Sequence, residues 1–376
     1  MNIYQLGMGW FPEKEGGLNR YFYDLNNHNY NDDVKYIPCV MTASHAEKPI
    51  AYNSLGYATD SVVKRLLSAR YKFKKLVSET KPDLIVSHFS LYTLPIIIFN
   101  KTVPLVVHFQ GPWAYESIVE NNNKLGGYIK KSIENLVYRR ATKFIVLSQS
   151  FKELLVERYG VAGNSVHVIP AGVDLNKFKL VIDTLPVKSQ LGMRQDKITL
   201  VCVRRLAKRM GIDVLIKAVS RLKLQGLNNL ELHIVGKGNE EVALKALVSE
   251  LGLNEEVKFA GFVADELLPN YYQAADFAIV PTIALEGFGL ITLEAMASGA
   301  TPIVTDIGGL PEVVRPFDAE LIAKSNSVDS LAECLQKNIL SNKHSRESCR
   351  LYVEENFSWE LINQRVLAVY KNAIVG

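Results

Sequence analysis

Short apolar runs alternate with longer amphipathic runs along almost the whole chain, and this alternation constrains the fold more than any other feature. In the first half, helical patterns at 61–79, 126–141 and 149–159 lie among apolar runs at 2–8, 35–41, 83–89, 104–110, 143–148 and 166–172. Continuous apolar strands separated by helices are typical of a parallel sheet covered by helices on both faces. The sequence therefore predicts an α/β fold.

The alternation stops once and then restarts. Residues 181–196 are polar and irregular, and beyond them strand-like runs at 198–206, 230–238, 257–263, 276–282 and 301–306 again alternate with helical patterns. A chain of 376 residues is also long for one core. We expect two doubly wound, Rossmann-like domains, 1–180 and 197–356, joined by a linker at 181–196 and facing each other across a cleft. Residues 357–376 form an amphipathic C-terminal helix that is long enough to cross back to the first domain.

The positive charge of the chain is concentrated in its first half. The net charge is +4 overall, but residues 1–180 carry +7 and the remainder carries −3. This imbalance predicts an anionic partner for the first half, such as a membrane surface. Nothing in the sequence indicates a nucleic-acid partner.

The helix expected at 61–79 is the most basic segment. An apolar stripe of Val62, Leu66, Ala69, Phe73 and Leu76 lies beside six cations, Lys64, Arg65, Arg70, Lys72, Lys74 and Lys75. One interpretation is a helix packed on the core with a solvated basic face. The other is a helix that docks on anionic lipid.

Several classes of protein are disfavoured. The four cysteines have no C-x-x-C spacing, the start resembles no signal peptide, and the most apolar run, "LYTLPIIIF", is too short to span a bilayer. We therefore expect a cytoplasmic protein that can bind the inner face of the membrane peripherally. The G-x-G runs at 7–9 and 236–238 do not complete a dinucleotide fingerprint. Because there is no D-x-D and no metal-spaced His/Cys cluster, we expect neither a cofactor nor a metal.

The stretch "LEGFGLITLEAMASG" at 285–299 carries the clearest chemical signal. Glu286 and Glu294 stand in an apolar, glycine-containing run, where an unpaired carboxylate would be costly. The amides of Phe288, Gly289 and Leu290 lie where a helix is expected to begin, which favours an anion site. A phosphate flanked by sugar hydroxyls would satisfy this arrangement. The alternative is a capping glutamate followed by a solvated helix glutamate.

Here a family resemblance becomes specific. "EGFGLITLEAMASGATPIV" resembles the E-x7-E motif of retaining glycosyltransferases of the GT-B fold, family 4 (glycosyl transferases group 1). "GGLNRY", "VIPAGVDLNKF", "GFVADELLPNYYQAADFAIVPT", "TDIGGLPEVV" and "FSWE" match further family segments in the same order. The resemblance covers nearly the whole chain.

The resemblance implies roles for individual residues. It places Glu286, as a catalytic residue, on the hydroxyls of a donor sugar and Glu294 on the ribose of a nucleotide. It gives the diphosphate to the amides of Phe288, Gly289 and Leu290, and the base to the backbone of Val263. It gives the distal phosphate or sugar to Gly16 and Gly17.

The basic segment "CVRRLAKRMG" departs from the family pattern G-R-L-x-x-x-K-G. Arg205 matches the arginine, but Met210 stands at the lysine position. We expect Arg209 to replace this lysine on the diphosphate, with Lys208 as a competitor. Cations are needed there because the departing diphosphate gains charge in the transition state.

Two histidines lie near the ends of apolar runs in the first half. The resemblance places His108 near the reacting carbon of the donor sugar, as a catalytic residue, although a histidine at a strand end is more often structural. His88 has a similar context, and we give it less weight as an acceptor-side residue.

Together these features predict a retaining, metal-independent glycosyltransferase. It would move a sugar from a nucleoside diphosphate sugar, by default a UDP-sugar, to a hydroxyl of a saccharide or a lipid-linked saccharide, in polysaccharide or glycolipid biosynthesis. One alternative is a sugar-nucleotide epimerase of the same fold. Another is a noncatalytic partner subunit that binds the nucleotide sugar.

Overall fold

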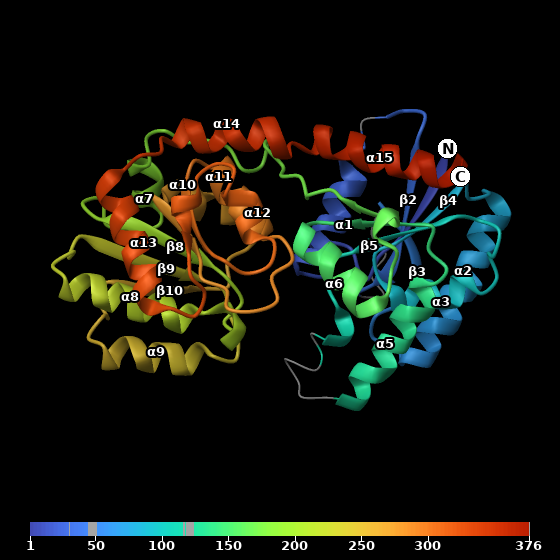
Figure 1. Cartoon of the computed structure of the whole chain (residues 1–376), viewed down its shortest axis with the longest axis horizontal. Coiled ribbons are helices and arrows are strands. Elements are labelled where there is room, and N and C mark those ends of the chain that lie inside the picture. The colour runs from blue at the N-terminus through green and yellow to red at the C-terminus, as the bar shows by residue number, and fades with distance from the viewer. Residues whose placement is uncertain (30, 44–50, 116, 118–123, 376) are drawn as a thin grey trace. The chain divides into compact units, whose positions relative to one another are not determined.

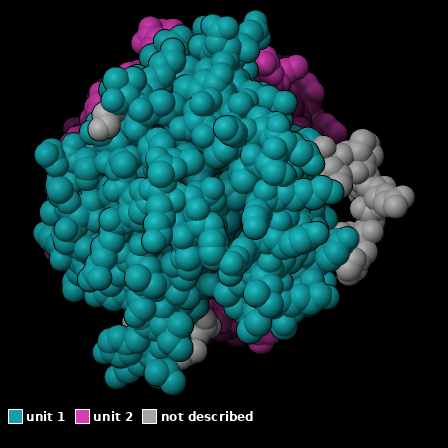
Figure 2. Space-filling model, turned by 90° about the vertical axis from the view of Figure 1, so that its right-hand side faces the viewer, with its two compact units in different colours: residues 1–172, 359–376 teal, residues 173–358 magenta. Residues whose placement is uncertain are grey.

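The computed structural model describes residues 1–29, 31–43, 51–115, 117 and 124–375. The chain forms two compact units (Figures 1 and 2). The first unit combines Met1–Gly172 with Trp359–Gly376, and the second is Val173–Ser358.

The first unit is built on a seven-stranded parallel sheet with the strand order β3-β2-β1-β4-β5-β6-β7. Its strands are β1 (Asn2–Leu6), β2 (Lys35–Thr42), β3 (Asn53–Tyr57), β4 (Leu84–Ser87), β5 (Leu105–Phe109), β6 (Lys143–Val146) and β7 (Val166–Val168). The polar, glycine-containing β3 was not predicted, because it lacks the apolar run that marks the other strands.

Helices cover both faces of this sheet (Figure 1). They are α1 (Gly17–Asn27), α2 (Val62–Glu79), α3 (Ser90–Ile97), α5 (Lys124–Tyr138), α6 (Gln149–Tyr159), α15 (Trp359–Val375) and the short 3-10 turn η1 (Gly163–Ser165). The main core forms between one face of the sheet and α2, α3, α5 and α6. On the opposite face, α1 and α15 pack through Phe22 against Val40 and through Tyr370 against His108.

The second unit repeats the plan with six parallel strands in the order β10-β9-β8-β11-β12-β13. The strands are β8 (Ile198–Val203), β9 (Leu230–Val235), β10 (Val257–Gly261), β11 (Phe277–Val280), β12 (Thr301–Thr305) and β13 (Ile322–Ala323). The helices are α7 (Leu185–Gln190), α8 (Ile212–Leu224), α9 (Glu241–Glu250), α10 (Leu268–Ala274), α11 (Leu290–Ala297), α12 (Leu310–Val314), α13 (Val328–Ser341), α14 (Arg346–Phe357) and the 3-10 turns η2 (Lys208–Met210) and η3 (Ala319–Leu321).

The boundaries between the units differ from those we expected. The chain passes from one unit to the other after Gly172 and again after Ser358, rather than near residues 180 and 356. Residues 181–196 are not an irregular linker, because they contain α7 and belong to the second unit. Lys188 of α7 is buried and donates a 2.9 Å hydrogen bond to Asp276, which fixes this segment to its own sheet.

The C-terminal helix α15 belongs to the first unit although it follows the second in sequence. Its residues Ile362, Val366 and Tyr370 are fully buried against the sheet. Asn363 accepts a 2.9 Å hydrogen bond from the Tyr36 hydroxyl of β2. Apolar spacing predicts such a helix, but only these contacts identify the sheet that it covers.

None of the helices in the described residues combines the length and the apolar character needed to cross a membrane.

Candidate functional site

Two neighbouring strands of the second unit end at an arginine and a glutamate that pair with each other. Arg204 follows β8, and Glu286 lies in the loop after β11, the strand that pairs with β8. The Arg204 guanidinium donates to the Glu286 carboxylate and to the Thr282 hydroxyl. Only 10% of the arginine side chain and 13% of the glutamate side chain are exposed. Taking charged groups out of water is costly, and the close pairing of the two side chains compensates part of this cost.

The backbone around Glu286 is held from two sides. Leu285 has a left-handed φ of 54°, which is costly for a residue with a branched side chain, and its carbonyl accepts a 2.9 Å hydrogen bond from Arg209. On the other side, the Gly309 amide donates to the Glu286 carbonyl at 3.1 Å. The neighbouring Gly308 has a φ of 58°, and a Cβ there would lie 1.8 Å from that carbonyl oxygen. The glycine pair of "TDIGGLPEVV" therefore allows this turn to contact the Glu286 loop closely.

The helix that carries Glu294 begins without a side-chain cap. Gly289 is the N-cap of α11, with a left-handed φ of 84°, and among the described residues no side-chain cap accepts a hydrogen bond from the first turn. By contrast, serine side chains cap α2, α6, α13 and α14. An uncapped first turn keeps its N–H groups available to an anion. The Thr292 hydroxyl in this turn is also buried and has no hydrogen-bond partner among the described residues.

Glu294 is buried rather than solvated. It is 7% exposed, and the Tyr272 hydroxyl donates to its carboxylate at 3.2 Å. Burial, and secondarily the nearby Glu294 charge, raise the pKa of Tyr272 well above its usual value, so this phenol stays a donor. The alternative of a solvated helix glutamate does not describe this residue.

The other cations of the segment 203–210 point to different surroundings. Arg205 and Lys208 are exposed, whereas Met210, at the position where the family pattern has lysine, is buried. Arg209 is half-buried and contacts the Glu286 loop through Leu285. Arg209 thus contacts the loop of the predicted site, whereas Lys208 is exposed.

Val263 lies just beyond β10, at the carboxyl edge of the same sheet, and is half-buried. The preceding Phe262 is 51% exposed, with the Lys237 ammonium 6.0 Å from its ring centroid. An exposed aromatic ring here is a surface on which a flat ligand could stack.

Gly16 and Gly17 begin α1 in the first unit. Gly16 has a φ of 114° and caps the helix without a side chain, as Gly289 does in the second unit. A Cβ at either glycine would meet no atom within 4 Å. The positive φ requires glycine at position 16, and the open space leaves room for a ligand at both positions.

His108 lies inside the first unit, with both ring nitrogens engaged. It is 3% exposed, and its Nε2 and Nδ1 lie 2.6 Å from the Tyr370 hydroxyl and 3.1 Å from the Tyr21 hydroxyl. Burial lowers the pKa of His108 to about 3, so the imidazole is neutral. These contacts favour the structural alternative for His108, since it connects α1 and α15 to the sheet.

His88 stacks on His108, with ring centroids 4.4 Å apart. Its Nε2 lies 2.8 Å from Gln5 Oε1 and its Nδ1 lies 3.0 Å from the Gln110 side chain. Burial, and then the neighbouring His108, lower the pKa of His88 well below its usual value. The two histidines therefore form one neutral, hydrogen-bonded cluster with Gln5, Tyr21 and Tyr370.

The sequence of the chain matches two family models in succession. The model of Glycosyltransferase Family 4 matches residues 16–177, and that of Glycosyl transferases group 1 matches residues 185–356. The chain belongs to glycosyltransferase family 4. The predicted resemblance is thereby confirmed.

Two curated relatives illustrate the place of this family 4 glycosyltransferase among known proteins. It is 32% identical over 251 residues to the mannosylfructose-phosphate synthase of Agrobacterium fabrum, covering 63% of this chain and 54% of the relative. It is 29% identical over 250 residues to an uncharacterised glycosyltransferase of Methanocaldococcus jannaschii, covering 65% of this chain and 63% of the relative. The matched region thus spans only about half to two thirds of these relatives.

Solved structures of the same fold match over the whole chain. The sucrose-phosphate synthase of Thermosynechococcus elongatus has a TM-score of 0.83 at 21% identity, covering 100% of this chain and 99% of that chain. Anabaena HepE in complex with UDP has a TM-score of 0.79 at 21% identity, covering 99% and 100%. The predicted GT-B fold, with its two α/β units, is confirmed.

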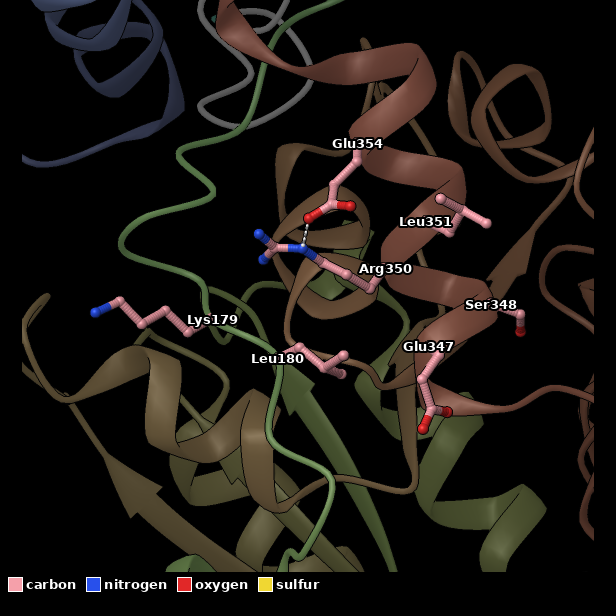
Figure 3. A pocket seen from close by; sticks show the side chains of 7 residues that line it. All are labelled: Lys179, Leu180, Glu347, Ser348, Arg350, Leu351 and Glu354. Atoms are coloured by element: carbon pink, nitrogen blue, oxygen red, sulfur yellow. Dashed lines mark hydrogen bonds and ion pairs between the residues drawn. The ribbon is translucent and has the colours of Figure 1, made fainter.

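One pocket of about 480 Å³ lies elsewhere in the second unit of this glycosyltransferase, between α14 and residues 179–180 (Figure 3). Arg350 and Glu354 of α14 form an ion pair beside it, and Arg350 also donates to the carbonyls of Phe178 and Ala297. None of the residues predicted to bind a donor lines this pocket. Its arginine serves to hold the chain segment before α7 against α14.

Sequence reasoning missed several residues of the site. Arg204 contacts Glu286, Thr282 contacts Arg204, and Tyr272 contacts Glu294, yet none of these three residues was predicted from the sequence to have a role. The doubled arginine at the end of an apolar strand was the available signal, but its spacing could not tell which of the two turns inward.

Proposed function

We propose that this glycosyltransferase moves a sugar from a nucleoside diphosphate sugar to an acceptor hydroxyl with retention of the anomeric configuration. The donor is a UDP-sugar, the acceptor is a saccharide or a lipid-linked saccharide, and the reaction needs no metal. The product belongs to polysaccharide or glycolipid biosynthesis.

One observation carries the proposal: the start of α11 at Gly289 lies between two largely buried, hydrogen-bonded glutamates. Glu286 precedes this first turn, which has no side-chain cap, and Glu294 lies one turn inside the helix. The N–H groups of this turn suit a diphosphate, and a carboxylate on either side suits the hydroxyls of a sugar and of a ribose. An extended ligand with a charged centre and hydroxyl-rich ends matches this order.

The choice of UDP is supported by similar structures. HepE of Anabaena, at 21% identity, is described in complexes with UDP, with UDP and glucose, and with UDP-glucose. Arg209 and the start of α11 supply positive potential for the leaving diphosphate, which is the work that a metal would otherwise do.

The experiment separates the two glutamates, because they hold different ends of one ligand. Glu294→Ala should weaken binding of both UDP and the intact donor by roughly 1–3 kcal/mol, as expected for lost hydrogen bonds to a charged group. Glu286→Ala should leave UDP binding nearly unchanged and lower the transfer rate instead, by about 100-fold, since the sugar is no longer positioned. Calorimetry with UDP, set beside transfer rates, measures both. Equal loss of UDP affinity in the two variants would contradict the division.

The same preparation distinguishes the alternatives. An epimerase would release an altered sugar from the donor without any acceptor, whereas a transferase of this kind would need an acceptor for rapid turnover. A noncatalytic subunit would bind UDP and show no turnover with any donor or acceptor. The anomeric configuration of the product, measured by NMR, tests retention.

We further propose that the first unit binds an anionic membrane surface through the outer face of α2. Most of the apolar stripe predicted for this helix faces the core: Ala69 and Phe73 are buried and Leu66 and Leu76 are partly buried against the same core, whereas Val62 is exposed. A second apolar set, Val63, Leu67 and Tyr71, is 68%, 62% and 73% exposed at a spacing of four residues. Lys64, Lys74 and Lys75 are exposed beside it.

The neighbouring end of α3 extends this surface. Phe99 is 52% exposed, and the Arg70 guanidinium of α2 lies 3.6 Å from its ring centroid. Apolar side chains surrounded by cations are typical of surfaces that insert shallowly into anionic lipid.

Vesicle sedimentation tests the membrane proposal. The combined variant Leu67→Ser, Tyr71→Ser, Lys74→Ser should bind phosphatidylglycerol-containing vesicles much less than the unchanged chain, because each exposed cation contributes about 1 kcal/mol near anionic lipid. Leu224→Ser, Val242→Ser is the matched control, since both residues are exposed apolar positions of the second unit. Equal binding of both variants would exclude α2 as the membrane contact.

A further inference from the structure

The backbone of Arg204 is held in place by hydrogen bonds to the end of β9 and to the loop that follows it. Its amide donates to the Val235 carbonyl at 2.9 Å, and the Leu206 amide donates to the Lys237 carbonyl at 2.9 Å. Gly236 has a φ of 137°, and a Cβ there would lie 2.0 Å from the Arg204 carbonyl oxygen. The glycines of "IVGKG" thus allow a close contact that fixes where the Arg204 side chain starts.

The far end of the side chain is fixed as well. The guanidinium bridges the Thr282 hydroxyl and the Glu286 carboxylate. Thr282 is fully buried, and its carbonyl accepts a hydrogen bond from Thr305. Glu286 is therefore held by a cation whose two ends are both anchored in the sheet.

Arg204 differs from two half-buried arginines that serve packing in the same unit. Arg346 donates through Nε, Nη1 and Nη2 to the carbonyls of Val181, Ala275, Gln273 and Ser298. Arg350 likewise uses its Nε, on Glu354 (Figure 3). The Nε of Arg204 is buried and has no partner among the described residues. A purely structural arginine would be expected to use all of its donors. Arg204 instead leaves its Nε without a described partner and directs Nη2 to the Glu286 carboxylate.

The charge of Arg204 also acts on the hydroxyl that donates to the second glutamate. Tyr272, the donor to Glu294, lies within the electrostatic reach of Arg204 as well as of Glu294. The cation that pairs with Glu286 thus also acts on the hydroxyl that donates to Glu294, so that Arg204 is linked to both acids of the E-x7-E motif.

We propose that Arg204 is a positioning residue of the donor site: it holds the Glu286 carboxylate in one orientation, so that the sugar of the nucleotide donor meets it correctly placed. The inference rests on the proposed function and adds a residue to it. Arg204 acts through Glu286 and not on the diphosphate.

The test uses the full chain and a panel of UDP-glucose, UDP-galactose, UDP-N-acetylglucosamine, GDP-mannose and ADP-glucose. The nucleotide sugar that raises the melting temperature of the unchanged chain most is the probe, and its free nucleoside diphosphate is the reference. Two quantities are measured: the dissociation constant of the nucleoside diphosphate, and kcat for its release from the nucleotide sugar with water as the acceptor.

Arg204→Met should leave the dissociation constant of the nucleoside diphosphate nearly unchanged and lower kcat by about 100-fold, because Glu286 loses its orientation. Arg204→Lys keeps the positive charge but lacks the planar guanidinium, so its kcat should lie between that of the unchanged chain and that of Arg204→Met. In a Glu286→Gln background, Arg204→Met should have little further effect, since the two residues act as one unit.

Equal losses of nucleoside diphosphate affinity and of kcat in Arg204→Met would overturn the proposal, and so would additive effects in the double variant. If Arg204→Met does not fold, Arg204→Lys decides alone: lower kcat at unchanged nucleotide affinity supports positioning, and unchanged kcat overturns it. If the unchanged chain binds none of the panel and releases no nucleoside diphosphate, the proposed function itself fails, which is a different outcome.

Discussion

The two units have the same sheet plan but place opposite kinds of chemistry at equivalent strand ends. Strands β4 and β11 occupy the same place in the two strand orders. The residue after β4 is His88, part of a neutral cluster, whereas the loop after β11 carries Glu286, paired with Arg204. The shared topology places a strand end at the same position in both units. The side chains there determine whether that strand end stabilises the fold or is suited to binding a ligand.

The difference follows from what each unit must hold. The histidine cluster satisfies its own hydrogen bonds and attaches α1 and α15 to the sheet. The charged pair of the second unit is held by glycines at close backbone contacts and lies near an uncapped helix. Neutral buried groups suit packing, while charged groups near unused donors suit a charged ligand.

The largest expected effect concerns acid, which should weaken the first unit through His108. The pKa of His108 is about 3 in the folded unit and about 6.5 in an unfolded chain, so the folded unit binds fewer protons between these values. The free energy of unfolding should therefore fall with falling pH from 6.5 downward, by about 3 kcal/mol at pH 4.5 from His108 alone. Tryptophan fluorescence reports this unit selectively, because Trp10, Trp113 and Trp359 all belong to it.

His108→Gln is the control for the acid effect. It should be less stable at neutral pH and show a flatter pH dependence than the unchanged chain. An identical pH dependence in both proteins would mean that the cluster is not the neutral centre that distinguishes the first unit.

A smaller effect tests the charged centre of the second unit. Arg209→Ala should weaken UDP binding by about 2 kcal/mol, because it removes a cation and also the 2.9 Å support of the Leu285 carbonyl. Calorimetry measures the loss, and Lys208→Ala, an exposed neighbour, is the matched control. A larger loss in the lysine variant would show that the cation was wrongly assigned.

The smallest effect tests whether contacts of α15 contribute to the stability of the first unit. Tyr370→Phe removes the hydroxyl that lies 2.6 Å from His108, so the tryptophan-reported stability should fall by about 1 kcal/mol. Tyr352→Phe removes a 2.8 Å hydrogen bond to the Val313 carbonyl in the second unit and should leave that fluorescence transition in place. Equal shifts in both variants would mean that the two units unfold as one.

Much of the fold could be predicted because the decisive patterns are local. The helix α6 occupies the residues 149–159 that its spacing indicates, and α11 begins at Leu290, where the sequence predicts a helix to begin. Apolar periodicity depends only on which neighbours share a face, and glycine before a helix depends only on backbone freedom. The polar strand β3 and the position of 181–196 were missed because neither carries its own apolar signal.

The site divides in the same way. The sequence by itself determined the two-unit α/β plan, the E-x7-E pair and the glycine that begins the helix between them. Only the tertiary structure decided that Arg204 rather than Arg205 meets Glu286, that His108 is enclosed by Tyr21 and Tyr370, and that α15 covers the first sheet. These outcomes depend on contacts between residues 82 to 262 positions apart, and no local pattern encodes which distant side chain will fill a given space.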